Sequence, residues 1–145
     1  MTYIDQVKND LIDDEGRRNF PYDDATGARV KCEGNITIGV GWNLENGLPN
    51  EIIDRLLDIG IERAMNDCVS IFPHFISLPD SKKRVLINLA FNMGRDRLLT
   101  FKKMIAAINE RDFKKAAEEL MDSKWAMQVQ KSRSTRLQLL LEQDA

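Results

Sequence analysis

Apolar residues fall on one helical face at the start of the chain, at positions Ile4, Val7, Leu11 and Ile12. Thr2, with Asp5 three residues later, has the form of a capping box. Gly16 is a residue at which helices commonly stop. We therefore predict a helix that begins after Thr2 and runs to about Asp14.

The pattern then changes to one typical of strands and turns. Residues 20–23 are expected to enter a turn at 24–27, and residues 33–35 form a second turn after 28–31. Ile36 to Val40 alternates as a strand does. A small antiparallel sheet is predicted, in which Gly39 and Gly41 let the backbone approach a helix or a bound sugar.

Helical periodicity returns in the second half of the chain. Pro49 suits the first turn of a helix over about 50–71, which at roughly 30 Å is long enough to join two lobes. Gly60 inside it costs about 1 kcal/mol relative to Ala, and bending, tight packing or chance could each explain it. A second helix is predicted from about 80 to Gly94, and it is expected to be central because its run 87–94 is apolar nearly all round. Shorter helices are predicted at 100–109, 112–122 and 132–142.

These elements predict an α+β, mostly helical fold in a single domain, residues 1–145. An N-terminal lobe of about 13–48 would carry the hairpin, and the linking helix would span about 50–71. A helical lobe of about 76–145 would pack against the first helix. A chain of 145 residues can bury a sizeable core.

The composition, 43% hydrophobic and 30% charged, is that of a folded protein and excludes disorder. The net charge is −2, but residues 1–80 hold 7 Lys or Arg against 15 Asp or Glu, while residues 81–145 hold 14 against 8. The C-terminal part is therefore the expected side for an anionic polymer, with chance asymmetry of solvated faces as the alternative. Nucleic acid is not expected, because the basic residues are not interleaved with aromatics.

Cys32 and Cys68 lie far apart without CxxC spacing, so we expect free thiols and neither a metal site nor a cofactor. The N-terminus has no basic start followed by an apolar run, so no signal peptide is predicted. No apolar window is long enough to span a bilayer. We expect a monomer that is made in a cytoplasm.

Two carboxylates and a hydroxyl are the candidates for chemistry. Glu15 falls at the end of the first helix, where the negative end of the helix dipole disfavours ionisation. Asp24 is the first residue of the predicted turn at 24–27, and Thr37 lies on the strand that follows. Such a set suits glycoside hydrolysis, in which one acid protonates the leaving oxygen and another group directs water.

Each candidate also has a structural reading. Glu15 could be a solvated helix end paired with Arg17 or Arg18. Asp24 could only open an Asx turn, and Thr37 could be an ordinary strand threonine. The single histidine, His74, is assigned no role. The joint spacing favours the catalytic interpretation.

Glu15-Gly16, Asp24 followed by Thr26-Gly27, and Thr37 to Gly41 together resemble the catalytic stretch of phage-type lysozymes of glycoside hydrolase family 24, including the T-even phage enzyme. The resemblance continues through residues 87–94, Phe101, residues 123–128, Arg133 and Arg136, and so covers nearly the whole chain. It implies a lysozyme-like fold with a small hairpin lobe and a helical lobe.

The resemblance also implies roles. Glu15 would be the general acid, Asp24 would orient or deprotonate water, and Thr37 would help to position that water. The substrate would be peptidoglycan, cut without metal by the inverting route between N-acetylmuramic acid and N-acetylglucosamine. Candidate saccharide or peptide contacts are Asn88, Asn92, Gln128 and Arg133, while Phe91 and Trp125 are expected in the core.

Three features depart from the family pattern. The hairpin at residues 28–35 is enlarged relative to the T-even phage enzyme, which could move the hydroxyl of Thr37 elsewhere. Trp42 stands where many relatives have a histidine, so an ion pair made there is lost. Asp23 adjoins Asp24, and only the spacing to Glu15 and Gly27 favours Asp24.

Two other functions remain open. A lytic transglycosylase needs an acid but no water-directing carboxylate, and a non-catalytic virion component would only bind peptidoglycan. As a lysozyme, the protein would reach the wall after holin-type release or as part of a virion, and would lyse bacteria.

Overall fold

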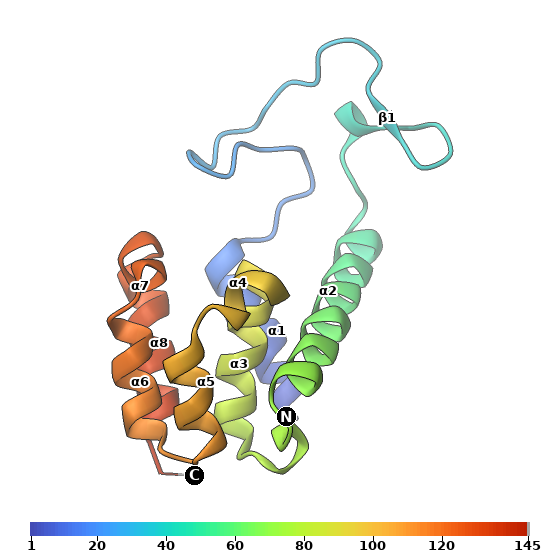
Figure 1. Cartoon of the computed structure of the whole chain (residues 1–145). Helices are drawn as coiled ribbons and strands as arrows, with labels where there is room; N and C mark the ends of the chain where they lie inside the picture. Colours follow the sequence, from blue (N-terminus) through green and yellow to red (C-terminus); the bar gives the residue numbers. More distant parts are fainter. Residues whose placement is uncertain (145) are drawn as a thin grey trace.

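The structure, a computed structural model, describes residues 1–144. Most of the chain is helical, and the helices are gathered at one end of the molecule (Figure 1). Two short 3-10 helices, η1 and η2, cover Leu44–Asn46 and Phe75–Ser77. The α-helices are α1 (Tyr3–Glu15), α2 (Asn50–Ile71), α3 (Asp80–Met93), α4 (Arg95–Leu99), α5 (Lys102–Asn109), α6 (Phe113–Met121), α7 (Lys124–Gln128) and α8 (Lys131–Glu142).

Helix α1 has the predicted caps. The backbone N–H of Asp5 donates to Thr2 Oγ1 at 3.2 Å, and the Thr2 N–H donates to the Asp5 carboxylate at 3.0 Å. At the other end Gly16 takes a φ of +76°, and its N–H donates to Ile12 O at 2.9 Å. The helix thus ends at Glu15, one residue beyond the predicted end.

The helical lobe, which we define as α1 and α3–α8, is built around α3. Helices α1, α2 and α8 pack on α3, and α6 packs against α5 and α8. The side chains of residues 85–90 are all buried, which explains why this part of α3 is apolar nearly all round. Trp125 is only 1% exposed, and the predicted α+β, mostly helical fold is confirmed.

Helix α2 has the predicted bounds, and its glycine has a packing role. A Cβ added at Gly60 would lie 2.5 Å from the ring of Phe91 on α3. Tight packing, one of the three explanations considered for Gly60, is therefore the correct one.

The N-terminal lobe, defined here as residues 16–49, is mostly irregular. Strands β1 (Thr37–Ile38) and β2 (Trp42–Asn43) pair antiparallel, and residues 22 and 29 form an isolated bridge. The prediction of one strand over Ile36–Val40 was wrong in extent, because Gly39 and Gly41 adopt φ values of +64° and +72° and turn the chain. Nothing lies within 4 Å of a Cβ at either glycine, so they serve this turn and not a close approach.

The N-terminal lobe is fastened to the first turns of α2. Asn19 Nδ2 donates to Leu48 O and to Asn50 Oδ1, each at 2.8 Å. Arg17 pairs with the Asp54 carboxylate and also donates to Asn50 O at 3.2 Å. In Figure 1 the lobe accordingly continues from the upper end of α2, beyond the body of the helical lobe.

One lysine is fully buried inside the helical lobe. Lys82 is 0% exposed, and its ammonium donates to Leu140 O at 2.9 Å and to Gln143 O at the end of α8. It also lies 5.1 Å from the centroid of the Phe113 ring. Burial lowers the pKa of Lys82, because the charged form loses water. The residue joins the start of α3 to the last turn of α8.

Both cysteines are free thiols, as predicted. Cys68 is buried in α2, and burial raises the pKa of its thiol. Cys32 lies in the irregular segment 30–36 of the chain, where its backbone N–H donates to the Glu45 carboxylate at 2.7 Å. Among residues 1–144, none of the helices combines the length and apolarity that crossing a membrane requires.

Candidate active site

Glu15 is held at the border between the two lobes. It is the last residue of α1, and its side chain is 34% exposed. Its Oε1 accepts a hydrogen bond from Arg133 Nη1 at 2.9 Å. The alternative partners are engaged elsewhere, since Arg17 pairs with Asp54 and Arg18 donates to Gly27 O at 2.9 Å.

The two adjacent aspartates of the turn have different roles. Asp23 Oδ1 accepts from the backbone N–H groups of Ala25 and Thr26 at 2.8 and 3.2 Å, which makes Asp23 the residue that closes the Asx turn. Asp24 is exposed, and within residues 1–144 its carboxylate accepts no hydrogen bond from the protein. The carboxylate of Asp24 is therefore free to meet a ligand.

Glu15 and Asp24 line the same cavity. It has a volume of about 530 Å³, within the range of ligand sites. Three segments form its walls: the end of α1, the turn of the N-terminal lobe, and the junction of α7 with α8. The lining residues are Asp13, Asp14, Glu15, Gly16, Arg18, Tyr22, Asp24, Ala25, Thr26, Gly27, Val129, Gln130 and Arg133.

Thr37 is placed differently. It lies on β1, is exposed, and is paired with Asn43 in the two-stranded sheet. It is not among the residues that line the cavity of Glu15 and Asp24. Segment 28–35 separates the turn that holds Asp24 from β1, and Thr37 on β1 does not line the cavity of the two carboxylates.

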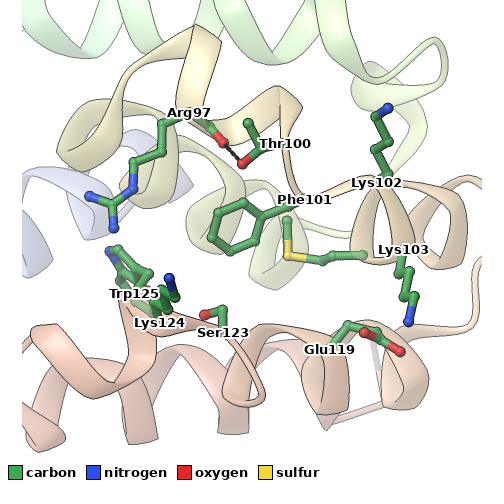
Figure 2. Close-up of a pocket in the computed structure, with 10 residues that line it drawn as sticks. Arg97, Thr100, Phe101, Lys102, Lys103, Glu119, Ser123, Lys124 and Trp125 are labelled. Carbon is green, nitrogen blue, oxygen red and sulfur yellow. Dashed lines mark hydrogen bonds between the residues drawn. The ribbon is translucent and has the colours of Figure 1, made fainter.

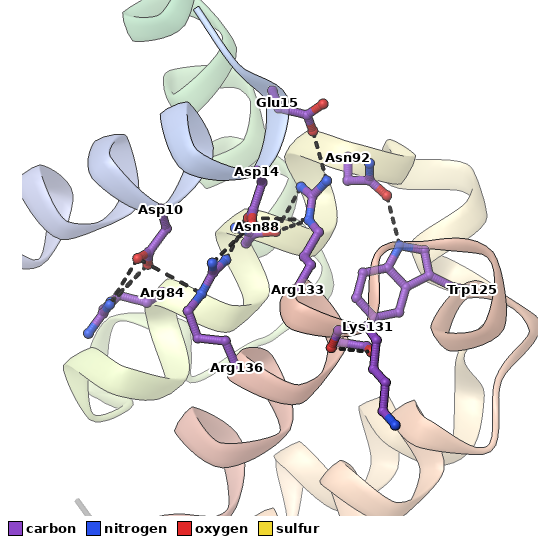
Figure 3. Close-up of polar contacts among 11 residues, drawn as sticks. Asp10, Asp14, Glu15, Arg84, Asn88, Asn92, Trp125, Lys131, Arg133 and Arg136 are labelled. Atoms are coloured by element: carbon purple, nitrogen blue, oxygen red, sulfur yellow. Dashed lines mark hydrogen bonds and ion pairs between the residues drawn. The ribbon is translucent and has the colours of Figure 1, made fainter. Parts of the chain in front are cut away.

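A buried polar network supports the Glu15 side of the cavity (Figure 3). Arg133 donates from Nε and Nη2 to Asn88 Oδ1 at 3.1 and 2.9 Å, and Asn88 Nδ2 donates to Asp14 Oδ2 at 3.0 Å. Arg136 Nη1 donates to Asp14 Oδ1 at 2.9 Å. Beyond Arg136, Asp10 forms an ion pair with Arg84 at 3.0 Å.

This network fixes charges that burial alone would disfavour. Asp14 has only 5% of its side chain exposed and is paired with two guanidiniums, those of Arg133 and Arg136. The hydrogen bond to Asp14, and the negative charges nearby, raise the pKa of Arg136 above its usual value. The network therefore locks Arg133, which in turn fixes the direction of the Glu15 carboxyl.

Of the four predicted saccharide or peptide contacts, Arg133 lines the cavity. Asn88 is 1% exposed and belongs to the network beneath it. Asn92 accepts from Trp125 Nε1 at 2.7 Å, and Gln128 accepts from Arg97 Nη2 at 2.8 Å. These two amides lie on neighbouring elements outside the cavity of Glu15.

The aspartates of α1 that pair with Arg133 and Arg136 were missed by the sequence interpretation. Asp10 and Asp14 lie four residues apart on one face of α1, and Arg133 and Arg136 lie three apart on one face of α8. Complementary pairs at helical spacing were the signal that could have identified them. Among residues 1–144, no three His, Cys, Asp or Glu side chains are grouped as metal ligands would be.

The site and the fold agree with similarities to known proteins. The family model described as phage lysozyme matches residues 13–140. "Probable T4-type lysozyme 2" of Dictyostelium discoideum is 29% identical over an alignment of 164 positions, gaps included, that covers 92% of each chain. "Probable T4-type lysozyme 1" of the same organism is 35% identical over 66 residues, covering 46% of this chain and 38% of that relative.

Proposed function

Because the chain belongs to the phage lysozyme family and is an enzyme of the lysozyme type, we propose that it hydrolyses peptidoglycan as a muramidase. The bond cleaved is the β-1,4 linkage between N-acetylmuramic acid and N-acetylglucosamine. The observation that carries this proposal is the presence of Glu15 and Asp24 on one cavity, supplied by separate segments of the chain.

In the proposed mechanism, Glu15 donates a proton to the glycosidic oxygen and Asp24 directs a water molecule at the anomeric carbon. The inverting route needs a gap of roughly 6.5 to 9.5 Å between the carboxyls, so that water fits between the sugar and the base. A cavity of about 530 Å³ supports this route, because it has room for both a sugar ring and water.

Arg133 and Thr37 have secondary parts in the proposal. Arg133 holds Glu15 in direction through the 2.9 Å contact, and the network below keeps Arg133 from turning away. Thr37 is proposed to help position the water when substrate draws the hairpin of the N-terminal lobe toward the cavity. Within residues 1–144 no hydrogen bond or ion pair joins the hairpin at 36–43 to the helical lobe; the side-chain hydrogen bonds of Trp42 and Asn43 go to Gly47 and Glu45, which leaves such a movement open.

The decisive measurement is clearing of purified cell walls by the parent and three variants. Glu15→Gln and Asp24→Asn should each lower the rate by about 10²- to 10⁴-fold, the usual contribution of acid–base groups. Asp23→Asn is the matched control, because it changes the adjacent carboxylate that only closes the turn, and it should retain most of the rate. Parent-like activity of Glu15→Gln would contradict the assignment.

Product analysis by mass spectrometry separates the alternatives. A hydrolase leaves reducing ends that carry one added water, whereas a lytic transglycosylase leaves only anhydromuramyl ends. A protein that merely binds the wall, such as a non-catalytic virion component, releases neither. We expect reducing ends, and their loss in Asp24→Asn would tie the water to that carboxylate.

We further propose that the enzyme causes lysis as a monomer, either after a holin-type pore releases it or as part of a virion. Expression in bacteria with and without a pore-forming membrane protein tests the first route. Lysis that depends on the pore supports release through the membrane. Lysis at the same rate without the pore would contradict it.

A further inference from the structure

A second cavity lies on the helical lobe, between the α4–α5 region and the α6–α7 region (Figure 2). Its volume is about 470 Å³, and it shares no residue with the cavity of Glu15 and Asp24. Phe101 and Met104 give it an apolar floor. The remaining lining is mainly basic, with Arg97, Lys102, Lys103 and Lys124.

The basic side chains that line this cavity outnumber its carboxylates. Glu119 is the one carboxylate in the lining. No ion pair to the three lysines of the cavity occurs among residues 1–144, and the guanidinium of Arg97 donates to the neutral amide of Gln128. Figure 2 shows Arg97 and Lys124 at one end, with Lys103 and Glu119 at the other. An anion between the two ends would meet cations on both sides.

The start of α5 adds to the positive electrostatic potential in this cavity. The first N–H groups of a helix lack acceptors within the helix and carry its positive end. In α5 the N-cap residue is Phe101, which supplies no side-chain acceptor, and the next two residues are Lys102 and Lys103. Acidic residues are preferred at these positions, because their charge balances the positive end of the helix. In α5 two lysines take their place and add to the positive charge, so this helix start favours an external anion.

Helix α6 shows the contrast within the same chain. It also begins with neighbouring lysines, Lys114 and Lys115, but its N-cap Asp112 accepts the backbone N–H of Lys115 at 3.1 Å. The protein thus supplies its own carboxylate at the start of α6 and none at the start of α5. Only the uncapped start of α5 opens into a basic cavity.

We propose that this second cavity binds the phosphate groups of a phosphodiester-linked cell-wall polymer. Phosphate suits clustered Lys and Arg side chains and free helix N–H groups, and the carbon skeleton of such a polymer can lie against Phe101. The site would hold the enzyme on the wall without taking part in bond cleavage. A nucleic-acid site that stacks successive bases is disfavoured, because the one aromatic ring in the lining besides that of Phe101 is the indole of Trp125, which is 1% exposed.

The test is a titration of the full chain with a soluble glycerol-phosphate oligomer, followed by the amide signals in NMR. The probe should shift the signals of residues 101–104 and 123–125. Binding is measured without turnover, so its result is independent of whether the enzyme hydrolyses peptidoglycan.

The double variant Lys102→Gln with Lys103→Gln should weaken binding by about 10-fold. It should also reduce the slope of log K against log salt by about two, roughly one for each lost phosphate contact. The matched control is Lys114→Gln with Lys115→Gln, which removes the same charge from a neighbouring lysine pair in the first turn of α6. The control should weaken binding by less than about 3-fold, since only distant, screened charge is removed.

Three results would overturn the proposal. Equal weakening by both double variants would show general attraction to a basic lobe. Absence of any shift at residues 101–104 would place the polymer elsewhere. Binding to vesicles containing phosphatidylglycerol, lost in the Lys102 and Lys103 variant while the oligomer fails to bind, would assign the cavity to a lipid surface.

Discussion

The helical lobe and the N-terminal lobe hold their halves of the candidate active site in different ways. Glu15 is fixed by Arg133, which is itself locked by buried Asn88 and Asp14. Asp24 lies on a turn closed by local hydrogen bonds, in a lobe whose apolar side chains, such as Ile38 and Val40, are largely exposed. One half of the site is therefore preorganised by packing, and the other half can adjust to substrate.

The largest expected difference between the lobes is in the cost of removing an apolar side chain. Leu89→Ala should lower the free energy of unfolding by about 4 kcal/mol, because Leu89 is 0% exposed in the centre of α3. Ile38→Ala should change it by less than about 0.5 kcal/mol, because Ile38 is 58% exposed. Urea unfolding measures both, and similar losses would show that the N-terminal lobe is packed more firmly than its exposure indicates.

Removal of an arginine from each lobe gives the next largest contrast. Arg133→Met should destabilise the protein by about 3 kcal/mol, at the low end for a broken buried pair, because Arg136 still neutralises Asp14. Arg18→Met removes a hydrogen bond between the exposed Arg18 and Gly27 O and should cost less than about 1 kcal/mol. Thermal unfolding distinguishes them, and a small effect at Arg133 would mean that water replaces its contacts.

A smaller effect is expected where α2 enters the helical lobe. Gly60→Ala should destabilise by about 1 to 2 kcal/mol, although Ala favours helix, because its Cβ would press on the Phe91 ring. Adding Phe91→Leu should recover part of the loss in a double-mutant cycle. If Gly60→Ala alone is stabilising, the two helices separate more easily than the contact suggests.

The smallest effects concern two exposed carboxylates: Asp5 in the first turn of α1, within the helical lobe, and Asp54 on α2, which pairs with Arg17 of the N-terminal lobe. Hydrogen bonds from the Thr2 backbone and hydroxyl lower the pKa of Asp5, and a hydrogen bond from Arg17 lowers the pKa of Asp54. Each carboxylate therefore adds stability that is complete above its ordinary pKa of 3.8 and is lost as pH falls through the lower folded pKa. In a plot of the free energy of unfolding against pH, Asp5→Asn and Asp54→Asn should each reduce the loss of stability on the acid side. An unchanged pH profile would contradict the assigned bonds.

Much of the helical lobe could be predicted, because long amphipathic patterns and caps report helices directly. The capping box at Thr2 and the stop at Gly16 gave the bounds of α1 to within one residue. Helices α4 and α7 were not predicted, since five residues form little more than one turn and show no periodicity. The strand at Ile36–Val40 was overextended because alternation does not reveal where two glycines reverse the chain.

Three residues of the candidate site, Glu15, Asp24 and Arg133, could be predicted from the sequence, but their arrangement could not. Spacing and resemblance selected Glu15 and Asp24, which the fold brings to one cavity. The partner of Glu15 is 118 positions away, at Arg133, and no local pattern joins the two. The distance of Thr37 from the cavity depends on the path of segment 28–35, which has no periodic pattern to reveal it.

Lys82 makes the last turn of α8 a condition for a stable helical lobe. Its ammonium has Leu140 and Gln143 carbonyls as its oxygen acceptors within residues 1–144. Proteolytic loss of α8 from Leu140 onward would leave a buried charge without either acceptor, which costs several kcal/mol. A molecule nicked there would open more readily and expose further cleavage sites, so a single cut in α8 would lead to degradation of the whole lobe.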